Sequence, residues 1–298
     1  MILLSGTSNR PLAQSIAHSL GISLGKADIT RFIDNECRVY VSENVADQEV
    51  FIVQSLSEVA DQHLVELCLL GQAVKSLKAA KMTAVIPWMG YSKQDKEFRK
   101  GEAVSADLVA RFIESAGFDE VITIELHSEA ITPYFHIPVK ELSTHNLLAS
   151  AIQVDPKRHI VVSPDLGGQT RSDRFAKNVS LPIVHLTKSR DRKTGKVTVT
   201  GISGSVTGLD VIIFDDIINT GATAIQTAQF LKDHGAGSIV FLATHAVLAG
   251  NATSLLGDSP IDRIVVTDTI EIPGRKRFEK LTVESVSSIL TSAIQNIS

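Results

Sequence analysis

The sequence predicts an α/β protein built on parallel strands, and two observations carry that prediction. Short apolar runs such as 211–214 recur along the 298-residue chain, and they have the length of strands buried on both faces. Between these runs lie longer segments, such as 61–77, whose apolar residues recur at helical spacing. Strands that alternate with helices favour parallel sheets covered by helices. A closed barrel is the alternative arrangement.

The first half of the chain begins with a predicted strand and helix. The helix should start near Pro11, which suits a first helical turn, and end at Gly21. Residues 31–36 form a polar connection before a strand with one exposed face at 38–43. Further apolar runs predict buried strands at 2–4, 50–55, 83–88 and 121–126.

A long charged segment, 89–105, follows the strand at 83–88. A loop of this length and charge is more typical of a ligand-binding or mobile segment than of a simple connector. The alternative is a charged face that only contacts solvent.

The pattern resets near 138–145, and a second series of strands and helices follows. A prior of about 150 residues per domain also favours two domains. We place them at 1–143 and 144–298, as two similar α/β domains. The last helix is predicted at 283–297 and could pack back on either domain.

Composition limits the classes of function. A formal net charge of −4 and a sequence pI near 6.1 argue against non-specific binding to nucleic acid or to a membrane. Cys37 and Cys68 stand apart without metal-ligand spacing, as expected for thiols in a reducing cytosol. Neither a signal segment nor an apolar run of membrane-spanning length appears, so we expect a cytoplasmic protein.

Residues 211–223 carry the strongest site signal. Asp215 and Asp216 directly follow the apolar run, at the end where parallel strands present ligands. Small and hydroxylic residues at 220–223 precede a helical pattern, so they should lie at a helix N-terminus, where unpaired N–H groups attract anions. Carboxylates beside a phosphate cradle suit a phosphorylated sugar. The alternative is an ordinary capped turn, which needs only one of these residues.

Two further strands end in residues that suit a metal. His127 follows the strand at 121–126, and Asp165 follows an apolar run and precedes Gly167 and Gly168. A carboxylate and an imidazole at two strand ends could share Mg²⁺, which needs few protein ligands. Taken alone, His127 is more often a structural histidine.

Segment 186–196 gathers five Lys and Arg side chains and has no apolar periodicity, so it should be a loop. Such a loop could close over phosphoryl groups. The alternative is an exposed hairpin tip.

Taken in order, these segments closely resemble the ribose-phosphate pyrophosphokinases over nearly the whole chain. The 211–223 motif is similar to a ribose-phosphate loop that phosphoribosyltransferases share. The segments that point to the pyrophosphokinases are RFIDNE, PWMGYSKQDKEFRKGE, ELHSEAI, VVSPDLGGQTR and the loop around Lys188 and Arg190.

The resemblance implies two domains with type I phosphoribosyltransferase-like folds. It also implies transfer of the diphosphoryl group of ATP to the anomeric hydroxyl of ribose 5-phosphate, with Mg²⁺ as cofactor and a homo-oligomer as the working form. Matching motifs assign ATP binding to Phe32, Asp34, Glu36, Lys93 and Gln94, and the resemblance allows a neighbouring subunit to contribute the first three. They assign Mg²⁺ to His127 and Asp165, catalysis to Lys188 and Arg190, and ribose 5-phosphate to Asp215, Asp216, Asn219, Thr220, Gly221, Ala222 and Thr223.

Three residues depart from the family pattern. Asn219 stands where many members have Asp, Lys93 where Arg is usual, and Trp88 where Tyr or Phe is usual. Two competing hypotheses therefore remain: a phosphoribosyltransferase, which would need none of the ATP-side segments, and a catalytically silent homologue that regulates an active partner.

Overall fold

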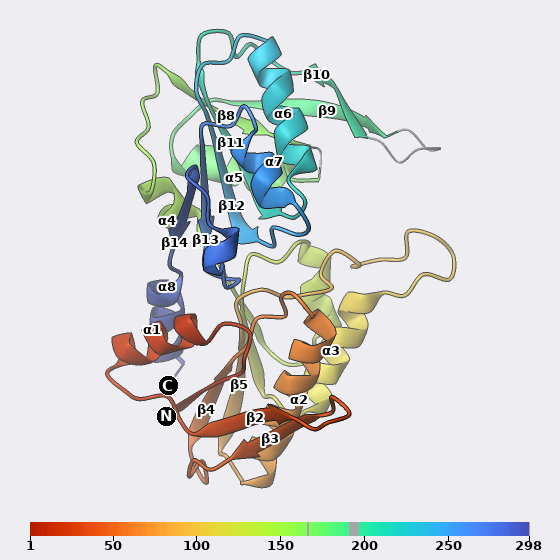
Figure 1. The fold of residues 1–298 in the computed structure, drawn as a ribbon, viewed down its shortest axis with the longest axis vertical. Coiled ribbons are helices and arrows are strands. Elements are labelled where there is room, and N and C mark those ends of the chain that lie inside the picture. Colours follow the sequence, from red (N-terminus) through yellow and green to blue (C-terminus); the bar gives the residue numbers. More distant parts are fainter. Residues whose placement is uncertain (166, 191–196, 298) are drawn as a thin grey trace. The chain divides into compact units, whose positions relative to one another are not determined.

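The structure, a computed structural model, describes residues 1–165, 167–190 and 197–297, with the side chains of Arg190 and Val197 outside the description. The chain forms two compact units (Figure 1). The first comprises Met1–Ser143, Thr269–Glu271 and the residues from Ser285 onward, and the second comprises Thr144–Asp268 and Ile272–Glu284. Within the described residues, no helix has the length and apolar character needed to cross a bilayer.

A parallel sheet of five strands, in the order β1-β4-β5-β6-β7, organises the described part of the first unit. Its strands are β1 (Ile2–Ser5), β4 (Glu49–Val53), β5 (Lys81–Ile86), β6 (Glu120–Ile124) and β7 (Val139–Leu142). Figure 1 shows α1 and α8 on one side of this sheet and α2 and α3 on the other. The helices are α1 (Arg10–Leu20), α2 (Ala60–Ser76), α3 (Ser105–Ser115) and α8 (Ser287–Gln295), with a 3₁₀ turn at Glu129–Tyr134.

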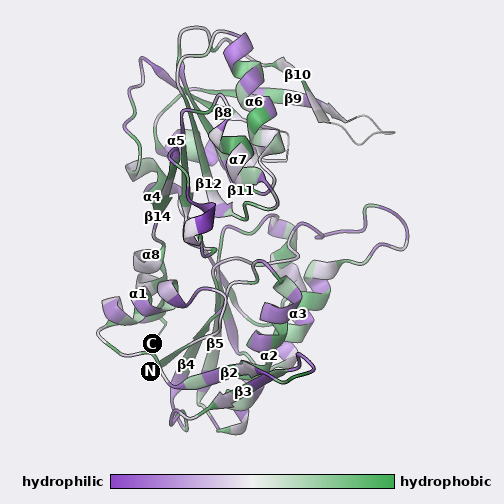
Figure 2. Cartoon of the chain, in the orientation of Figure 1, coloured by the Kyte–Doolittle hydropathy of each residue, from purple (hydrophilic) through white to green (hydrophobic). Residues whose placement is uncertain are grey.

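Helices on both faces explain why the strands of this unit read as continuous apolar runs. Ile52 and Ile86 are fully buried, and so are the α2 residues Leu67 and Leu70 in the same cluster. Figure 2 shows largely hydrophobic central strands and helices that mix hydrophobic with hydrophilic residues. Burying one face of each helix against the sheet is therefore the main apolar contribution to this unit.

A separate two-stranded hairpin precedes β4. Strands β2 (Ala27–Arg31) and β3 (Cys37–Val41) pair antiparallel, and Arg31 lies opposite Cys37 at the last pair before the tip. Ile29 and Val39 pack against the core of the unit, while the outer-facing Arg38 and Tyr40 are exposed.

The second unit is organised around a sheet of seven strands, as far as the chain is described, in the order β10-β9-β8-β11-β12-β13-β14. Only the β9–β10 pair is antiparallel in this described sheet. The strands are β8 (His159–Ser163), β9 (Ile183–Arg190), β10 (Val197–Ile202), β11 (Asp210–Ile218), β12 (Ile239–Ala246), β13 (Arg263–Thr267) and β14 (Leu281–Glu284).

Helices cover both faces of this sheet as well. Helices α6 (Ala222–Asp233) and α7 (Ala252–Gly257) bury Leu231 and Leu256 in one cluster with Ile213 of β11. Helices α4 (His145–Ser150) and α5 (Gln169–Asn178) contribute to the opposite cluster, where the rings of Phe175 and Phe214 stack at 4.3 Å. Strand β11 is thus buried from both sides at the centre of the sheet.

Most of the predicted elements are confirmed. Helix α1 starts one residue before Pro11, and its C-terminal Gly21 has a left-handed φ of 69°. The segment 89–104 contains no helix or strand, as predicted. The strand β2 was not predicted, because its alternation of half-buried and exposed side chains is weak.

Three predictions of element extent are wrong. Strand β11 continues to Ile218 instead of ending at 214, because Asp215, Ile217 and Ile218 have partners on β12. Residues 186–190 belong to strand β9 and not to a loop, because β10 supplies the hydrogen-bonding partner that apolar periodicity does not reveal; residues 191–196 lie outside the described ranges. The last helix begins at Ser287, since 281–284 form the edge strand β14.

Asp210 provides a pH test of the second unit's fold. Its carboxylate accepts from the Ser238 N–H at 2.8 Å and pairs with Arg158 Nη2 at 3.0 Å. The hydrogen bonds from Ser238 lower the pKa of Asp210, and the Arg158 charge adds to that shift. Because the folded pKa is depressed, the stabilisation is present above the unfolded pKa and is lost as the pH falls through the folded pKa.

We therefore expect Asp210→Asn to lower the free energy of unfolding at pH 7 by about 1.5–3 kcal/mol, the range for a hydrogen bond to a charged group. The deficit should shrink as urea denaturation is repeated at progressively lower pH below 5. Asp258→Asn, a change at an exposed carboxylate of the same unit, is the control. A deficit that is constant with pH would contradict the assignment.

Candidate functional site

The turn between β11 and α6 forms the centre of the candidate site in the second unit. Asn219 and Thr220 are exposed, Gly221 precedes the helix with a left-handed φ of 78°, and α6 begins at Ala222. Among the described side chains none caps this helix start, so its first N–H groups are suited to an anion. A Cβ on Gly221 would lie 3.0 Å from Leu256 Cγ, which together with the positive φ explains the glycine.

The two aspartates of β11 differ in their surroundings. The side chain of Asp215 is 13 % exposed, whereas that of Asp216 is 2 % exposed. Arg171 Nη1 lies 2.9 Å from Asp216 Oδ1 and 3.7 Å from Asp215 Oδ1. A buried carboxylate needs such a partner, so Asp216 is engaged by the protein and Asp215 is the more accessible of the two.

Arg171 is the site residue that the sequence analysis missed. It lies in the first turn of α5, directly after Gly167 and Gly168. The available sequence signal was a cation three residues after a glycine pair at a strand end. Its role depends on β8 and β11 being adjacent, which only the topology reveals.

Asp165 and Lys188 complete this cluster. Asp165 Oδ1 accepts from the Gly168 N–H at 2.8 Å, and a Cβ on Gly168 would lie 3.4 Å from the same oxygen. Burial raises the pKa of Asp215 well above its ordinary value, and the charges of Asp216 and Asp165 add to the shift. Burial lowers the pKa of the half-buried Lys188, while Asp165 and Asp215 oppose that effect.

This cluster suits a bound cation. The charges of Asp216 and Asp165 add to the raised pKa of Asp215, and added positive charge would relieve that repulsion. Within the described residues, no three His, Cys, Asp or Glu side chains are arranged as a complete metal site. Mg²⁺ commonly takes one or two carboxylates and completes its shell with water and substrate phosphates. The residues therefore fit a cation that is held jointly with a substrate.

In the first unit, the predicted ATP-side and metal residues follow the carboxyl ends of neighbouring strands. Lys93 and Gln94 come after β5, and His127 comes after β6, which pairs with β5. Lys93 and His127 are half-buried and Gln94 is exposed. Gln94 Oε1 accepts from Ser105 Oγ at 2.6 Å, which ties the loop to the start of α3.

The other predicted ATP-side residues lie on the tip of the β2–β3 hairpin. Phe32 is 53 % exposed, and Asp34 and Glu36 are exposed as well. The tip is closed by bonds from the Phe32 N–H to Glu36 O and from the Asn35 N–H to Phe32 O, both 2.9 Å. An exposed aromatic ring beside two carboxylates is suited to stacking on a flat, polar ligand.

The predicted site residues thus form separate groups in the two units. Asp165, Lys188 and the β11–α6 turn lie at one edge of the second unit's sheet. The side chain of Arg190 lies outside the described residues, although its backbone belongs to β9. Together, the turn and its carboxylates give this α/β protein the chemistry that an anionic group beside a cation would need.

Comparisons with known proteins give the family. Residues 1–117 match the N-terminal domain of ribose phosphate pyrophosphokinase, and residues 168–298 match the phosphoribosyl synthetase-associated domain. The ribose-phosphate pyrophosphokinase of Caldanaerobacter subterraneus subsp. tengcongensis is 38% identical over 297 residues, which are 99% of this chain and 94% of that protein. Ribose-phosphate pyrophosphokinase 1 of Listeria innocua is 37% identical over 300 residues, covering 99% and 93%.

A solved structure supports the same conclusion. The crystal structure of phosphoribosylpyrophosphate synthetase from Mycobacterium smegmatis superimposes with a TM-score of 0.93 at 30% identity, and the match covers 99% of this chain and 98% of that one. The chain belongs to the ribose-phosphate pyrophosphokinase family. The predicted fold class is confirmed.

Arg171 allows a test of the electrostatics of the site. Replacing it by Met leaves the buried Asp216 without its positive partner, and loss of one partner of a buried pair costs about 3–5 kcal/mol. We expect Arg171→Met to lower the unfolding free energy by that amount, and Arg171→Met/Asp216→Asn to recover part of it. Lys177→Met, at an exposed position of the same helix, is the control. If Arg171→Met and Lys177→Met have the same unfolding free energy in urea, Arg171 does not compensate the negative charge of these carboxylates.

Proposed function

We propose that this protein transfers the β,γ-diphosphoryl group of ATP to ribose 5-phosphate, giving phosphoribosyl diphosphate and AMP. The anomeric oxygen of the sugar forms a bond to the β-phosphorus, and the bond from that phosphorus to the bridging oxygen of AMP breaks. The proton of the anomeric hydroxyl is released. The observation that carries the proposal is the uncapped start of α6 beside Asp215, in a chain that matches this family over its whole length.

The acceptor site is assigned to the second unit. The N–H groups at 219–223 would bind the 5-phosphate, because a helix start without a side-chain cap offers unpaired donors and a partial positive charge. Asp215 would accept hydrogen bonds from the ribose hydroxyls. Asp216 would hold the neighbouring Asp215 in position, since Asp216 is buried and paired with Arg171.

The donor site is assigned to the first unit. Phe32 offers an exposed face for the purine ring, and Asp34 and Glu36 would accept from its amino group. Lys93 and Gln94 would contact the rest of the nucleotide. Lys93 supplies a point charge where the two-pronged donor of an Arg is more usual. The substitution weakens the orientation of the nucleotide more than its electrostatic attraction.

Mg²⁺ would be held by Asp165 and His127, and when bound it neutralises charge on the triphosphate. The chain's own contribution is positional. Lys188 reaches the carboxylate cluster from β9, and its ammonium can neutralise charge that develops on the transferring group. Arg190, on the same strand, would assist. Phosphoryl transfer depends on such positioning and charge neutralisation more than on covalent chemistry.

The site of the reaction is the cytoplasm, in keeping with the two free thiols, and the working form is a homo-oligomer. A phosphoribosyltransferase is disfavoured by the ATP-side segments that match the first family domain. A silent regulatory homologue is disfavoured by the presence of Lys188, Arg190, His127 and Asp165; Asn219 is the residue that favours it.

The direct test is to mix the purified chain with ATP, Mg²⁺, ribose 5-phosphate and inorganic phosphate. We expect equimolar AMP and phosphoribosyl diphosphate, and no product when EDTA is present. AMP formed without phosphoribosyl diphosphate would point to another acceptor. No AMP at all, with ATP still bound, would favour the silent homologue.

Lys188→Ala tests the assignment of the catalytic cation. We expect kcat to fall by about 10²–10³-fold, the usual effect of removing one group that stabilises developing charge. The KM for ribose 5-phosphate should change little, because Lys188 acts in the transition state. Lys157→Ala, an exposed lysine of the same unit, is the control. An unchanged kcat would remove Lys188 from the mechanism.

A further inference from the structure

The hairpin β2–β3 is a weak element on its own. A two-stranded hairpin is marginally stable in water, and its tip, residues 32–36, is exposed along its whole length. Asn35 even holds a left-handed φ of 69°. A tip that must present Phe32 in one position therefore needs an anchor from the body of the unit.

A buried glutamate on α2 supplies such an anchor. Glu66 is 4 % exposed and accepts three hydrogen bonds. Thr7 Oγ1 donates to its Oε2 at 2.5 Å, and Gln54 Nε2 donates to the same oxygen at 2.9 Å. Arg31 Nη2 donates to Oε1 at 3.0 Å and is the cationic partner.

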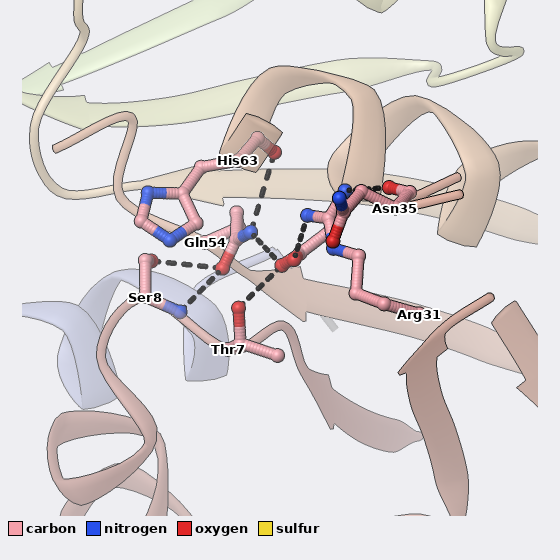
Figure 3. A network of polar contacts seen from close by, with 7 residues as sticks. Thr7, Ser8, Arg31, Asn35, Gln54 and His63 are labelled. Carbon is pink, nitrogen blue, oxygen red and sulfur yellow. Dashed lines mark hydrogen bonds and ion pairs between the residues drawn. The ribbon is translucent and has the colours of Figure 1, made fainter. Parts of the chain in front are cut away.

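Gln54 holds the Glu66 carboxylate in place through the hydrogen bond from its Nε2. Its amide is 0 % exposed and fully engaged: Oε1 accepts from Ser8 N and Oγ, and Nε2 donates to Glu66 and to His63 O. Figure 3 shows Gln54 between Ser8, Thr7 and His63, with Arg31 and Asn35 on the far side of the network. A Cβ on Gly6 would lie 2.2 Å from Gln54 Oε1, so the approach of this amide also requires a glycine.

Arg31 joins the buried network to the exposed tip. It is the last residue of β2, and while Nη2 binds Glu66, Nη1 donates to the Asn35 carbonyl at 3.3 Å. Asn35 in turn closes the tip through its N–H to Phe32 O. One guanidinium therefore ties the position of the tip to α2 and, through Gln54 and Thr7, to the loops after β4 and β1.

We propose that Glu66 and Arg31 are positioning residues that fix the hairpin tip for recognition of the purine of ATP. The inference rests on the proposed function, because it takes Phe32, Asp34 and Glu36 as the nucleotide-contacting residues. Neither residue needs to touch the nucleotide. Their effect is to restrict the tip before binding, which lowers the entropy lost when a ligand is bound.

Two variants separate positioning from folding. Glu66→Gln keeps the size of the side chain but removes the charge that holds Arg31. Arg31→Lys keeps a cation for Glu66 but cannot also reach the Asn35 carbonyl, because an ammonium lacks the two-pronged geometry of a guanidinium. Lys81→Met is the control, since it breaks another ion pair of the same unit, Lys81–Glu120. The side chains of that pair are 36% and 14% exposed, and those of Arg31 and Glu66 are 33% and 5% exposed.

We expect both variants to raise the KM for ATP about tenfold, which corresponds to one lost charged hydrogen bond. The kcat and the KM for ribose 5-phosphate should change less than twofold, and discrimination between ATP and GTP should fall. Amide hydrogen exchange at Phe32 and Asn35 should become faster, while that of β4 stays as in the parent chain. Lys81→Met should leave all of these values unchanged.

The outcomes distinguish this inference from the proposed function. If the parent chain forms no AMP, the proposed function fails, and exchange at the tip together with equilibrium binding of ATP still decides the inference. If the parent chain is active and both variants keep its KM for ATP, the inference is wrong. The same holds if all kinetic constants and the melting temperature fall together in both variants, since that pattern indicates a purely structural role.

Discussion

Two adjacent aspartates inside the central strand β11 are the constraint on which the second unit depends. Carboxylates in a buried strand are costly unless positive charge is close, and this unit supplies it from two other strands' ends. Arg171 comes from the start of α5, after β8, and Lys188 comes from β9. The sheet order places β8 between β9 and β11, so the arrangement of strands is also the arrangement of charges.

The first unit uses a buried carboxylate in a related way but for another purpose. Glu66 lies on a helix, accepts three hydrogen bonds and is joined to an exposed tip through Arg31. In the second unit the carboxylates themselves lie on β11, shortly before the turn that leads into α6. In both units one arginine pairs with a buried acid, Arg31 with Glu66 and Arg171 with Asp216.

The sequence was sufficient for much of the fold. Buried strands such as β5 and β6 were found because helices cover both of their faces, which makes them continuous apolar runs. Helix α1 was found because Pro11 and Gly21 mark its ends by backbone preference. The hairpin arm of β9 and the edge strand β14 were missed, since an exposed or edge strand is stabilised by its neighbour's backbone and leaves little trace in side-chain pattern.

For the candidate site, the sequence by itself determined the residue types and their place near the carboxyl ends of strands: two aspartates before a small-residue turn, Asp165 before two glycines, and a cation-rich segment. Local chemistry is enough for this, because a strand end and a helix start are defined by nearby residues. Only the tertiary structure decided which of these groups face one another. Asp216 is buried against Arg171 while Asp215 remains accessible, and Glu66 reaches Arg31 across 35 residues, because contacts between strands and helices depend on sheet order. The 211–223 motif thus predicted an anion site, and the packing of α5 against β11 determined that Arg171 balances the charge of Asp216.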